Sequence, residues 1–260
     1  MSTIYALFLG LLQGLLEFLP VSSSAHFKLA KHFLDLKVLD NSPIFELVCN
    51  LGTSLAAIIF LRKEIYNILF HDRQKFFLIL LAIVPLVPIY IFFKHIQKLT
   101  SSMEVLGFFF IVTSLLLFTA IFYKNKTIEN SSNRKIKDML FIGFMQGLAL
   151  IPGISRSGST ISAACYRSWS IKEAISFSFL LSIPTVMGGN VLEAAKLFLK
   201  DAPTLNISLI SYIVGFLASF IMGIVSIRFI FSITSKKKLL PFAWYTLILG
   251  LVTIVYFNFV

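Results

Sequence analysis

The sequence contains little charge. Asp, Glu, Lys and Arg together make up 13% of its 260 residues, about half the share in an ordinary soluble domain. Hydrophobic residues make up 57% of the chain, and the mean hydropathy is +0.88. Several apolar runs reach the length of about 20 residues that crosses a bilayer. A soluble fold is excluded, because so few polar side chains cannot cover its surface. The composition predicts an all-α polytopic membrane protein.

The chain also has few cysteines, and its N-terminal region has no basic residues before Lys28. Cys49 and Cys165 lie in apolar segments without partners at metal-ligand spacing. This excludes a cysteine metal site and favours two small buried side chains. The first lysine is Lys28, and Glu17 interrupts the first apolar run, which argues against a signal peptide. The first segment is therefore expected to remain in the mature protein.

Acidic residues are outnumbered by basic ones, 12 to 23, so the net charge is +11. No nucleic-acid-binding motif accompanies the basic residues. They cluster in short loops between apolar runs, which indicates membrane orientation and contact with anionic lipids. The loops at 62–75, 124–138, 167–172 and 236–238 hold 14 Lys and Arg residues, and the opposite loops hold seven. The positive-inside rule therefore predicts that the first set is cytoplasmic and that both termini lie outside.

The chain reads as two similar halves. Gln13-Gly14-Leu15 recurs as Gln146-Gly147-Leu148, and each copy leads to a proline and a serine cluster. Each half is a broken, re-entrant helix hairpin plus three transmembrane helices, so the second half must enter the membrane inverted. We expect one integral membrane domain, 1–260, with repeat 1 at about 1–123, a linker at about 124–138 and repeat 2 at about 139–260. The expected hairpin helices are 3–19, 27–36, 139–151 and 156–166, and the expected spans are 44–61, 76–93, 104–123, 173–195, 206–232 and 239–259.

The second hairpin carries residues suited to a phosphate group. Pro152 ends the preceding helix, and Gly153 and Gly158 let the backbone turn and expose its N–H groups. The guanidinium of Arg156 offers a planar fork that matches two phosphate oxygens. A helix resuming near Thr160 would add the positive end of its dipole. The alternative is a Gly/Ser loop with Arg156 snorkelling to the interface. Four hydroxyls accompany the arginine: Ser155, Ser157, Ser159 and Thr160.

The first hairpin carries a carboxylate. Gln13 and Glu17 are four residues apart and share a helix face before Pro20. A carboxylate is costly in lipid, so Glu17 is a functional candidate, the alternative being a cap or an ion pair with a lysine. A carboxylate, a histidine (His26), hydroxyls and an arginine suit phosphoryl transfer. Glu17 would assist the nucleophile, which is Ser23, His26 or water. A divalent cation, Mg²⁺ or Ca²⁺, would lie between Glu17 and a diphosphate.

Two long motifs resemble the bacterial undecaprenyl-diphosphate phosphatases of the bacitracin-resistance type. They are the stretches QGLLEFLPVSSSAH at 13–26 and PGISRSGST at 152–160, and the resemblance covers the whole chain. It implies an enzyme of the bacterial plasma membrane that hydrolyses undecaprenyl diphosphate and recycles the lipid carrier of peptidoglycan synthesis. It also implies a divalent metal and a site open to the periplasmic or outer face.

The resemblance also implies roles for individual residues. Glu17 falls on the family's catalytic glutamate and His26 on its motif histidine, and Ser23 and Arg156 complete the expected catalytic set. Gln13 stands where many relatives carry glutamate, which argues against a two-carboxylate metal site. Asn50 replaces a common glutamine. Glu46 and Asn50 are four residues apart, and they either form a supporting pair near the site or simply belong to the start of a helix. The expected substrate-binding residues are Gln13, Ser22, Ser24, Gly153, Ser155, Ser157, Gly158 and Thr160.

Two other functions use the same features. A transporter or flippase of a polyprenyl phosphate lipid would also have inverted repeats with broken helices. The acid-phosphatase-like lipid phosphatases need further Lys/Arg and Ser-Arg-His motifs that this chain lacks. Trp169, Trp244 and Tyr245 are expected in the aromatic belt. The expected partners are a polyprenyl diphosphate substrate and membrane lipids. The sequence leaves open the nucleophile, the preferred metal, the prenyl length, assembly into a homo-oligomer and lipid flipping.

Overall fold

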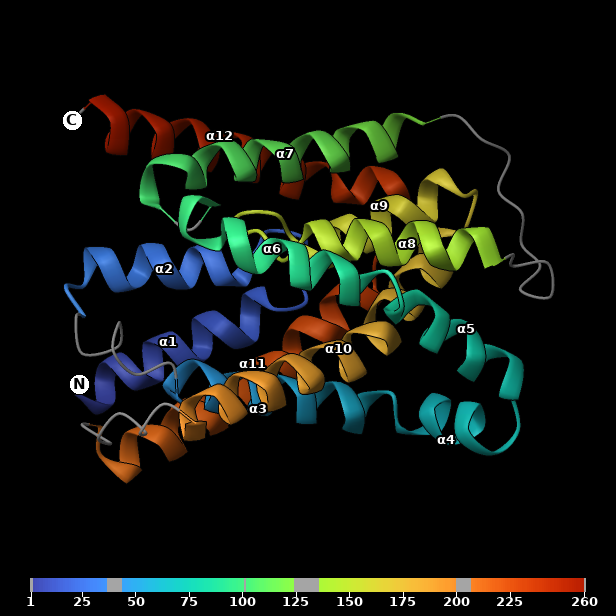
Figure 1. Cartoon of the computed structure of the whole chain (residues 1–260), viewed down its shortest axis with the longest axis horizontal. Helices are drawn as coiled ribbons and strands as arrows, with labels where there is room; N and C mark the ends of the chain where they lie inside the picture. The colour runs from blue at the N-terminus through green and yellow to red at the C-terminus, as the bar shows by residue number, and fades with distance from the viewer. Residues whose placement is uncertain (1, 37–43, 101, 124–135, 200–206, 260) are drawn as a thin grey trace. The chain divides into compact units, whose positions relative to one another are not determined.

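A computed structural model describes residues 2–36, 44–100, 102–123, 136–199 and 207–259, apart from the side chains of 94–99 and 198. Most of the predicted linker, 124–135, lies outside the described residues. The described chain is helical and contains no strand. Its helices (Figure 1) are α1 Thr3–Leu16, α2 Ser23–Phe33, α3 Ile44–Phe60, α4 Arg62–Phe70, α5 Arg73–Ile83, α6 Leu86–Thr100, α7 Met103–Phe122, α8 Ile136–Leu148, α9 Arg156–Tyr166, α10 Ile171–Leu199, α11 Leu209–Phe231, the 3₁₀ helix η3 Lys236–Leu239 and α12 Leu240–Phe259.

Five helical stretches of the described chain are long and apolar enough to cross a membrane. A sixth is added if α3 and α4, which break at Leu61, count as one span. The spans predicted near 76–93, 104–123, 173–195, 206–232 and 239–259 are confirmed in length and composition. The one predicted at 44–61 ends at Phe60 and is 17 residues long. The five stretches are Arg73–Phe93, Met103–Phe122, Ile171–Leu197, Leu209–Phe231 and Lys236–Phe259.

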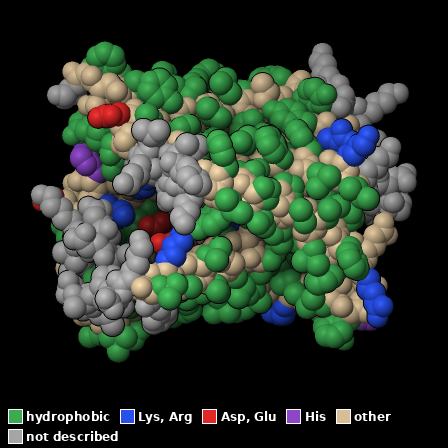
Figure 2. All heavy atoms as spheres, in the orientation of Figure 1, with side chains coloured by type: hydrophobic (Ala, Val, Ile, Leu, Met, Phe, Trp, Pro, Cys, Tyr) green, Lys and Arg blue, Asp and Glu red, His purple; other side chains and the backbone are tan. Residues whose placement is uncertain are grey.

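The surface is largely apolar, as a membrane protein requires. Hydrophobic side chains cover most of the face seen in Figure 2. Phe77, Phe92 and Val191 each expose about two thirds of their area, far more than a water-soluble protein tolerates over contiguous patches. An apolar surface of this kind suits contact with lipid tails, and the packed core lies between the helices.

The chain forms two compact units, each built from both halves of the sequence. Unit 1 comprises Met1–Phe18, Ser23–Arg62 and Ser182–Phe229, and unit 2 comprises Leu19–Ser22, Lys63–Leu181 and Ile230–Val260. In unit 1, α1 packs closely on α11: a Cβ at Gly14 would lie 2.5 Å from the Ser219 carbonyl oxygen. In unit 2, α7 and α12 run side by side (Figure 1), and α8 and α9 pack against each other.

Both predicted helix breaks are confirmed. α1 ends at Leu16 and α8 at Leu148, each four residues before a proline, which cannot continue a helix. The hairpin helix predicted at 156–166 has the bounds of α9, whereas α1, α2 and α8 each differ from their predicted bounds by a few residues. α8 begins at Ile136, inside the segment predicted as linker. α9 begins at Arg156, as the range 156–166 predicted, so its N-terminal end lies four residues before Thr160; Ser155 caps it by accepting a hydrogen bond from the Gly158 N–H at 3.1 Å.

Candidate functional site

Glu17 is the centre of a hydrogen-bonded cluster in unit 1. It lies at the C-terminal end of α1 and is half-buried. Its Oε2 atom accepts hydrogen bonds from Gln13 Nε2 at 2.9 Å and from Ser23 Oγ at 2.6 Å. Gln13 Nε2 also donates to Asn50 Oδ1 at 2.6 Å. These bonds draw α1, α2 and α3 together around one carboxylate, which Asn50 reaches through Gln13.

The rest of α2 carries His26 and two lysines. His26 follows Ser23 by three residues and is buried, whereas Ser24 is exposed. Ser24 therefore points away from the cluster that its neighbour Ser23 joins. The Lys28 ammonium and the Glu46 carboxylate act on each other electrostatically. Burial lowers the pKa of Lys28, and Glu46 opposes that shift by stabilising the charged form.

The loop between α8 and α9 is fixed by residues of the first motif that belong to unit 2. Gly153 has a φ of +103°, which glycine adopts readily. Its N–H donates to Ser22 Oγ at 3.2 Å, and Ser157 Oγ donates to the Leu19 carbonyl oxygen at 2.8 Å. Ser22 has a φ of +69°, an uncommon value outside glycine that often marks a functional turn. The turn after α1 and the loop before α9 thus hold one another.

Thr113 of α7 fixes the same loop from the other side. Its Oγ1 donates to the Gly153 carbonyl oxygen at 2.8 Å and accepts from the Ser155 N–H at 2.9 Å. Thr113 is 1% exposed. Sequence reasoning missed this residue, although a threonine inside the apolar run FFFIVTSLLLF is a polar signal that points to an interhelical bond.

The loop presents fewer N–H groups to a ligand than the sequence predicted. Gly153, Ser155 and Gly158 give their N–H groups to Ser22, Thr113 and Ser155. Within the described part of the chain, the N–H of Ser157, in the first turn of α9, has no acceptor. A helix N-terminus with an open N–H and an adjacent arginine is suited to an anion.

Thr160 is used inside the protein. Its hydroxyl bonds the Arg156 and Ser157 carbonyl oxygens and the Ser178 hydroxyl, the last at 2.7 Å. Ser155 Oγ is likewise engaged, by the Gly158 N–H and by Ser157 Oγ at 3.2 Å. These hydroxyls shape the first turn of α9, and Arg156, at its first position, is half-buried.

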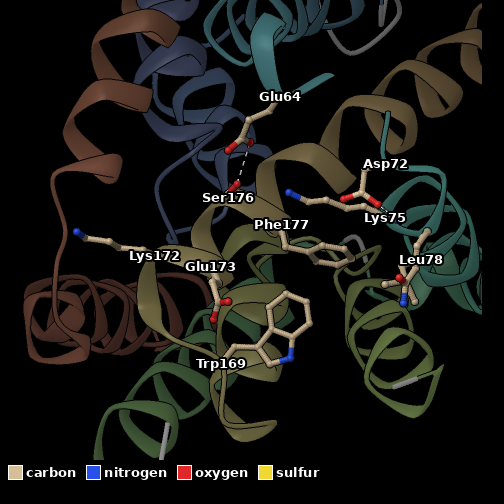
Figure 3. A pocket seen from close by; sticks show the side chains of 10 residues that line it. Glu64, Asp72, Lys75, Leu78, Trp169, Lys172, Glu173, Ser176 and Phe177 are labelled. Atoms are coloured by element: carbon tan, nitrogen blue, oxygen red, sulfur yellow. Dashed lines mark hydrogen bonds between the residues drawn. The ribbon is translucent and has the colours of Figure 1, made fainter. Parts of the chain in front are cut away.

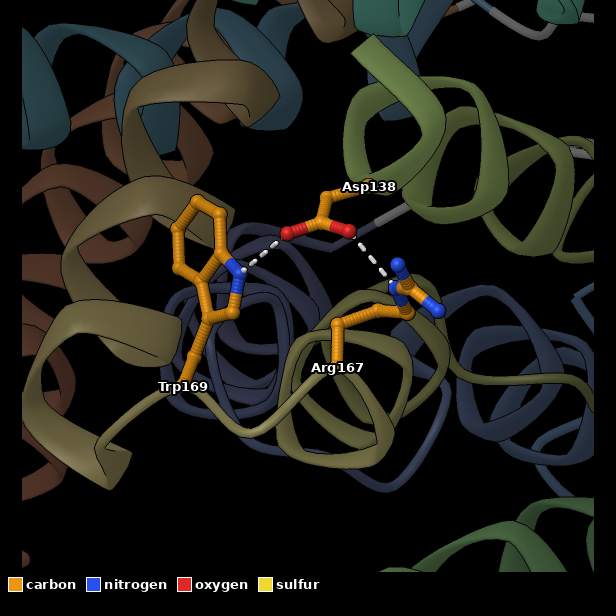
Figure 4. A network of polar contacts seen from close by, with 3 residues as sticks. All are labelled: Asp138, Arg167 and Trp169. Atoms are coloured by element: carbon orange, nitrogen blue, oxygen red, sulfur yellow. Dashed lines mark hydrogen bonds and ion pairs between the residues drawn. The ribbon is translucent and has the colours of Figure 1, made fainter. Parts of the chain in front are cut away.

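An ion pair closes the far end of the α8–α9 hairpin (Figure 4). Asp138, 5% exposed, accepts from Arg167 Nε at 2.6 Å and from Trp169 Nε1 at 3.3 Å. This clamp joins the start of α8 to the end of α9 and so fixes the hairpin that carries Arg156. Trp169 is 5% exposed, so its predicted place in the aromatic belt is wrong. Trp244 and Tyr245 are about half exposed, as a belt requires.

The predicted site residues thus fall into two groups. Unit 1 holds Gln13, Glu17, Ser23, Ser24 and His26, and unit 2 holds Ser22, Gly153, Ser155, Arg156, Ser157, Gly158 and Thr160. Phe18 precedes Leu19 in the chain and Ser23 follows Ser22, so the first motif contributes covalently to both. The first group offers a carboxylate bonded to a hydroxyl, and the second a helix N-terminus beside a guanidinium.

The carboxylate group fits only one way of holding a cation. Among the described residues, no three His, Cys, Asp or Glu side chains come together at metal-ligand distances. The described hydrogen bonds of the cluster join Glu17 to Gln13 and Ser23, and Gln13 to Asn50, none of which is an acid. A single carboxylate matches Mg²⁺, which proteins commonly bind through one or two carboxylates, water and substrate phosphates. It does not match a cation held by protein ligands alone.

Comparison with known proteins gives a consistent result over nearly the whole chain. Residues 6–252 match the family described as bacitracin resistance protein BacA. An undecaprenyl-diphosphatase of Protochlamydia amoebophila is 37% identical over 97% of this chain and 98% of its own length. One of Carboxydothermus hydrogenoformans is 38% identical, with 98% and 97% covered. One of Halothermothrix orenii is 33% identical, with 98% of each chain covered.

Proposed function

The chain belongs to the BacA family of bacitracin resistance proteins, and from this premise we propose that it hydrolyses undecaprenyl diphosphate to undecaprenyl phosphate and phosphate. The reaction recycles the lipid carrier for peptidoglycan synthesis. The observation that carries the proposal is the Glu17 cluster, in which a carboxylate in an apolar chain accepts a short hydrogen bond from the Ser23 hydroxyl. Transport of the same lipid is not favoured, because the relatives are named as diphosphatases.

Ser23 is the nucleophile that this cluster supports best. A nucleophile and its base are expected within hydrogen-bonding reach, and Ser23 Oγ donates to Glu17 Oε2 at 2.6 Å. Glu17 takes the hydroxyl proton while the Ser23 oxygen bonds to the terminal phosphorus. The anhydride bond breaks, and undecaprenyl phosphate leaves. Water then hydrolyses the phosphoserine. His26, three residues further along α2, assists proton transfer to or from these groups.

The second motif binds the diphosphate in this proposal. Arg156 supplies a planar pair of donors, and the open Ser157 N–H adds the helix dipole of α9. Gly153, Ser155, Ser157 and Gly158 shape this turn. The hydrogen bonds from Gly153 to Ser22 and from Ser157 to Leu19 hold this turn against residues of the first motif.

A divalent cation completes the proposed site. Glu17 would hold it together with substrate phosphate oxygens, and the cation would neutralise charge that builds up on those oxygens. Calorimetric binding of Mg²⁺ or Ca²⁺ to the purified chain, in the presence of a non-hydrolysable prenyl diphosphonate, tests this independently of turnover. Binding should be lost in Glu17→Ala. Equal binding by the variant would contradict Glu17 as the ligand.

The finer architecture is also proposed. The chain is an inverted repeat in the bacterial plasma membrane, with two re-entrant hairpins, α1–α2 and α8–α9, and a site that opens to the outer face. The recurrence of the Gln-Gly-Leu motif and the matching helix breaks before Pro20 and Pro152 support the repeat. The aromatic and aliphatic side chains along the spans provide the surface for a long prenyl tail.

Phosphate release from C55 diphosphate tests the activity. Glu17→Ala and Arg156→Ala are expected to lose activity by a factor of about 100 or more, as removal of a general base or an oxyanion partner commonly does. The matched control Glu104→Ala changes an exposed acid of α7 and should retain activity. A chain that moves the lipid across vesicles without releasing phosphate would contradict the enzyme proposal.

A further inference from the structure

A polar cavity lies in unit 2, and none of the proposed catalytic or substrate-binding residues lines it. Its volume is about 500 Å³, and α4, the start of α5 and the start of α10 enclose it. Figure 3 shows its side chains. They are charged, uncharged polar, aromatic and aliphatic: Glu64, Asp72, Gln74, Lys75, Leu78, Trp169, Lys172, Glu173, Ser176 and Phe177.

The cavity has an excess of negative charge. Glu64, Asp72 and Glu173 line it, and in Figure 3 Lys75 extends into it while Lys172 points away from the other side chains. Three carboxylates against one inward ammonium favour a ligand with a positive group. The walls of Trp169 and Phe177, whose ring centroids are 5.1 Å apart, add aromatic surface, which attracts cations.

Two carboxylates are already held in place by the protein. Glu64 Oε2 accepts from Ser176 Oγ at 2.9 Å. Glu173 Oε2 accepts from the N–H and the hydroxyl of Ser170, at 3.2 and 2.9 Å. Within the described part of the chain, Glu64 Oε1 has no partner, so a fixed acceptor faces the cavity. Preorganised acceptors of this kind bind an ammonium group without further ordering.

Lys75 gives the cavity a site for an anionic group as well. Its backbone N–H donates to Oδ1 of Asp72, the N-cap of α5, at 2.9 Å, and its ammonium forms no ion pair with any described residue. A ligand that joins an ammonium to a phosphate would satisfy both the carboxylates and Lys75. A trimethylated ammonium would satisfy them poorly, because it has no N–H to donate.

The segments around the cavity have the composition expected at a membrane interface. α4 forms one wall and exposes Tyr66, Leu69 and Phe70 by more than half of their areas, the pattern of a short helix lying at the lipid boundary. Basic residues stand at both ends of α4 in the chain, as expected of segments that meet anionic head groups: Arg62, Lys63 and Arg73. Lipid head groups are therefore the most abundant ligands within reach.

We propose that this cavity binds the head group of a zwitterionic aminophospholipid, with Glu64 and Glu173 on the ammonium and Lys75 on the phosphate. Trp169 joins the cavity to the clamp at Asp138, whose carboxylate accepts the indole N–H at 3.3 Å. A bound head group therefore stabilises the α8–α9 hairpin. The cavity that holds it is lined by residues of the basic segments 62–75 and 167–172.

Tryptophan fluorescence of the full-length chain in detergent tests the proposal. The chain has two tryptophans, so Trp244→Phe leaves Trp169 as the reporter. Short-chain phosphatidylethanolamine should bind saturably, and about tenfold more tightly than phosphatidylcholine or phosphatidylglycerol, since one charge-assisted hydrogen bond corresponds to about that factor. Equal response to the three lipids would overturn the proposal. So would free phosphoethanolamine binding as tightly as the lipid, because the ligand would then be a soluble amine.

Matched variants locate the site. Glu64→Gln keeps an acceptor for Ser176, and Glu173→Gln keeps the capping arrangement, so each removes only the charge. Each should weaken phosphatidylethanolamine binding about tenfold, and Glu104→Gln, an exposed acid outside the cavity, should not. Unchanged binding in both cavity variants would place the lipid elsewhere. Should a variant fail to fold, the comparison of the three lipids on the chain with an unaltered cavity still tests the proposal.

Discussion

Two glutamines at corresponding points of the halves have different surroundings. The Gln13 amide donates to Glu17 and Asn50. The Gln146 amide is buried, and neither its nitrogen nor its oxygen has a partner in the described chain. The residue four positions after Gln13 is an acid, whereas Leu150 stands four positions after Gln146. The repeated motif thus has its acidic partner in the first half only.

This difference predicts opposite effects of one substitution. Gln13→Leu leaves Glu17 and Asn50 without their donor, and we expect it to lower the free energy of unfolding by about 1–3 kcal/mol and to reduce phosphate release. Gln146→Leu removes an amide that bonds nothing in the described chain. We expect its effect on stability to be small or favourable, because an apolar side chain of similar size avoids the cost of burying an unpaired amide.

Thermal unfolding of both variants in one detergent measures the contrast. Equal destabilisation by the two substitutions would contradict it and would indicate that Gln146 has bound water as its partner.

At the scale of the helices, local patterns located the breaks and the range 156–166 of α9, but the positive end of its dipole was expected near Thr160 and lies at Arg156. Pro20 and Pro152 act on their own chain neighbours, so the sequence was sufficient to place the breaks. Gly158 suggested a continuing loop because glycine is a poor helix former. In the structure it lies in the first turn of α9, where a Cβ would come within 3.1 Å of Ser155 Cβ. Close packing overrides the propensity there.

The contacts that were not predicted are long-range in the sequence. Thr113 bonds Gly153 and Ser155 across 40 and 42 residues, and Asn50 bonds Gln13 across 37. No periodicity within either segment carries that information. The burial of Trp169 was missed for the same reason, since its partner Asp138 belongs to another helix.

The Thr113 contacts lead to a prediction about the loop. Thr113→Val keeps the shape of the side chain but removes one donor and one acceptor, which leaves the Gly153 carbonyl and the Ser155 N–H unpaired. We expect a loss of about 2–4 kcal/mol of stability, from two hydrogen bonds at about 1–2 kcal/mol each. We also expect a higher KM, because the turn before Arg156 loosens.

Thr253→Val is the matched control. Thr253 is also buried in a span, but among the described residues its hydroxyl bonds only the Leu249 carbonyl of its own helix, at 2.7 Å. Chemical unfolding and steady-state kinetics of the two variants should differ clearly. Similar values would mean that Thr113 does not support the loop.

For unit 2 as a whole, the charge pattern and the contacts agree. Residues from 62–75 and 167–172 line one cavity, Asp138 pairs with Arg167, and Lys236 acts electrostatically on Cys165. Members of all four basic segments therefore lie at one end of this unit. At the opposite end of the α7–α12 pair, Asn258 Nδ2 donates to the Glu104 carbonyl oxygen at 3.2 Å. The positive-inside rule assigns the end with more Lys and Arg residues to the cytoplasm.

Cysteine labelling tests this orientation in intact cells. The native Cys49 and Cys165 are fully buried, so an impermeant maleimide should not reach them. Arg73→Cys and Lys172→Cys lie at the basic end and should be protected until the membrane is opened. Glu104→Cys and Asn258→Cys lie at the other end, on exposed positions, and should react from outside. Labelling of both ends from the same side would contradict the cytoplasmic assignment of the basic loops, and with it the expectation that the C-terminus lies outside.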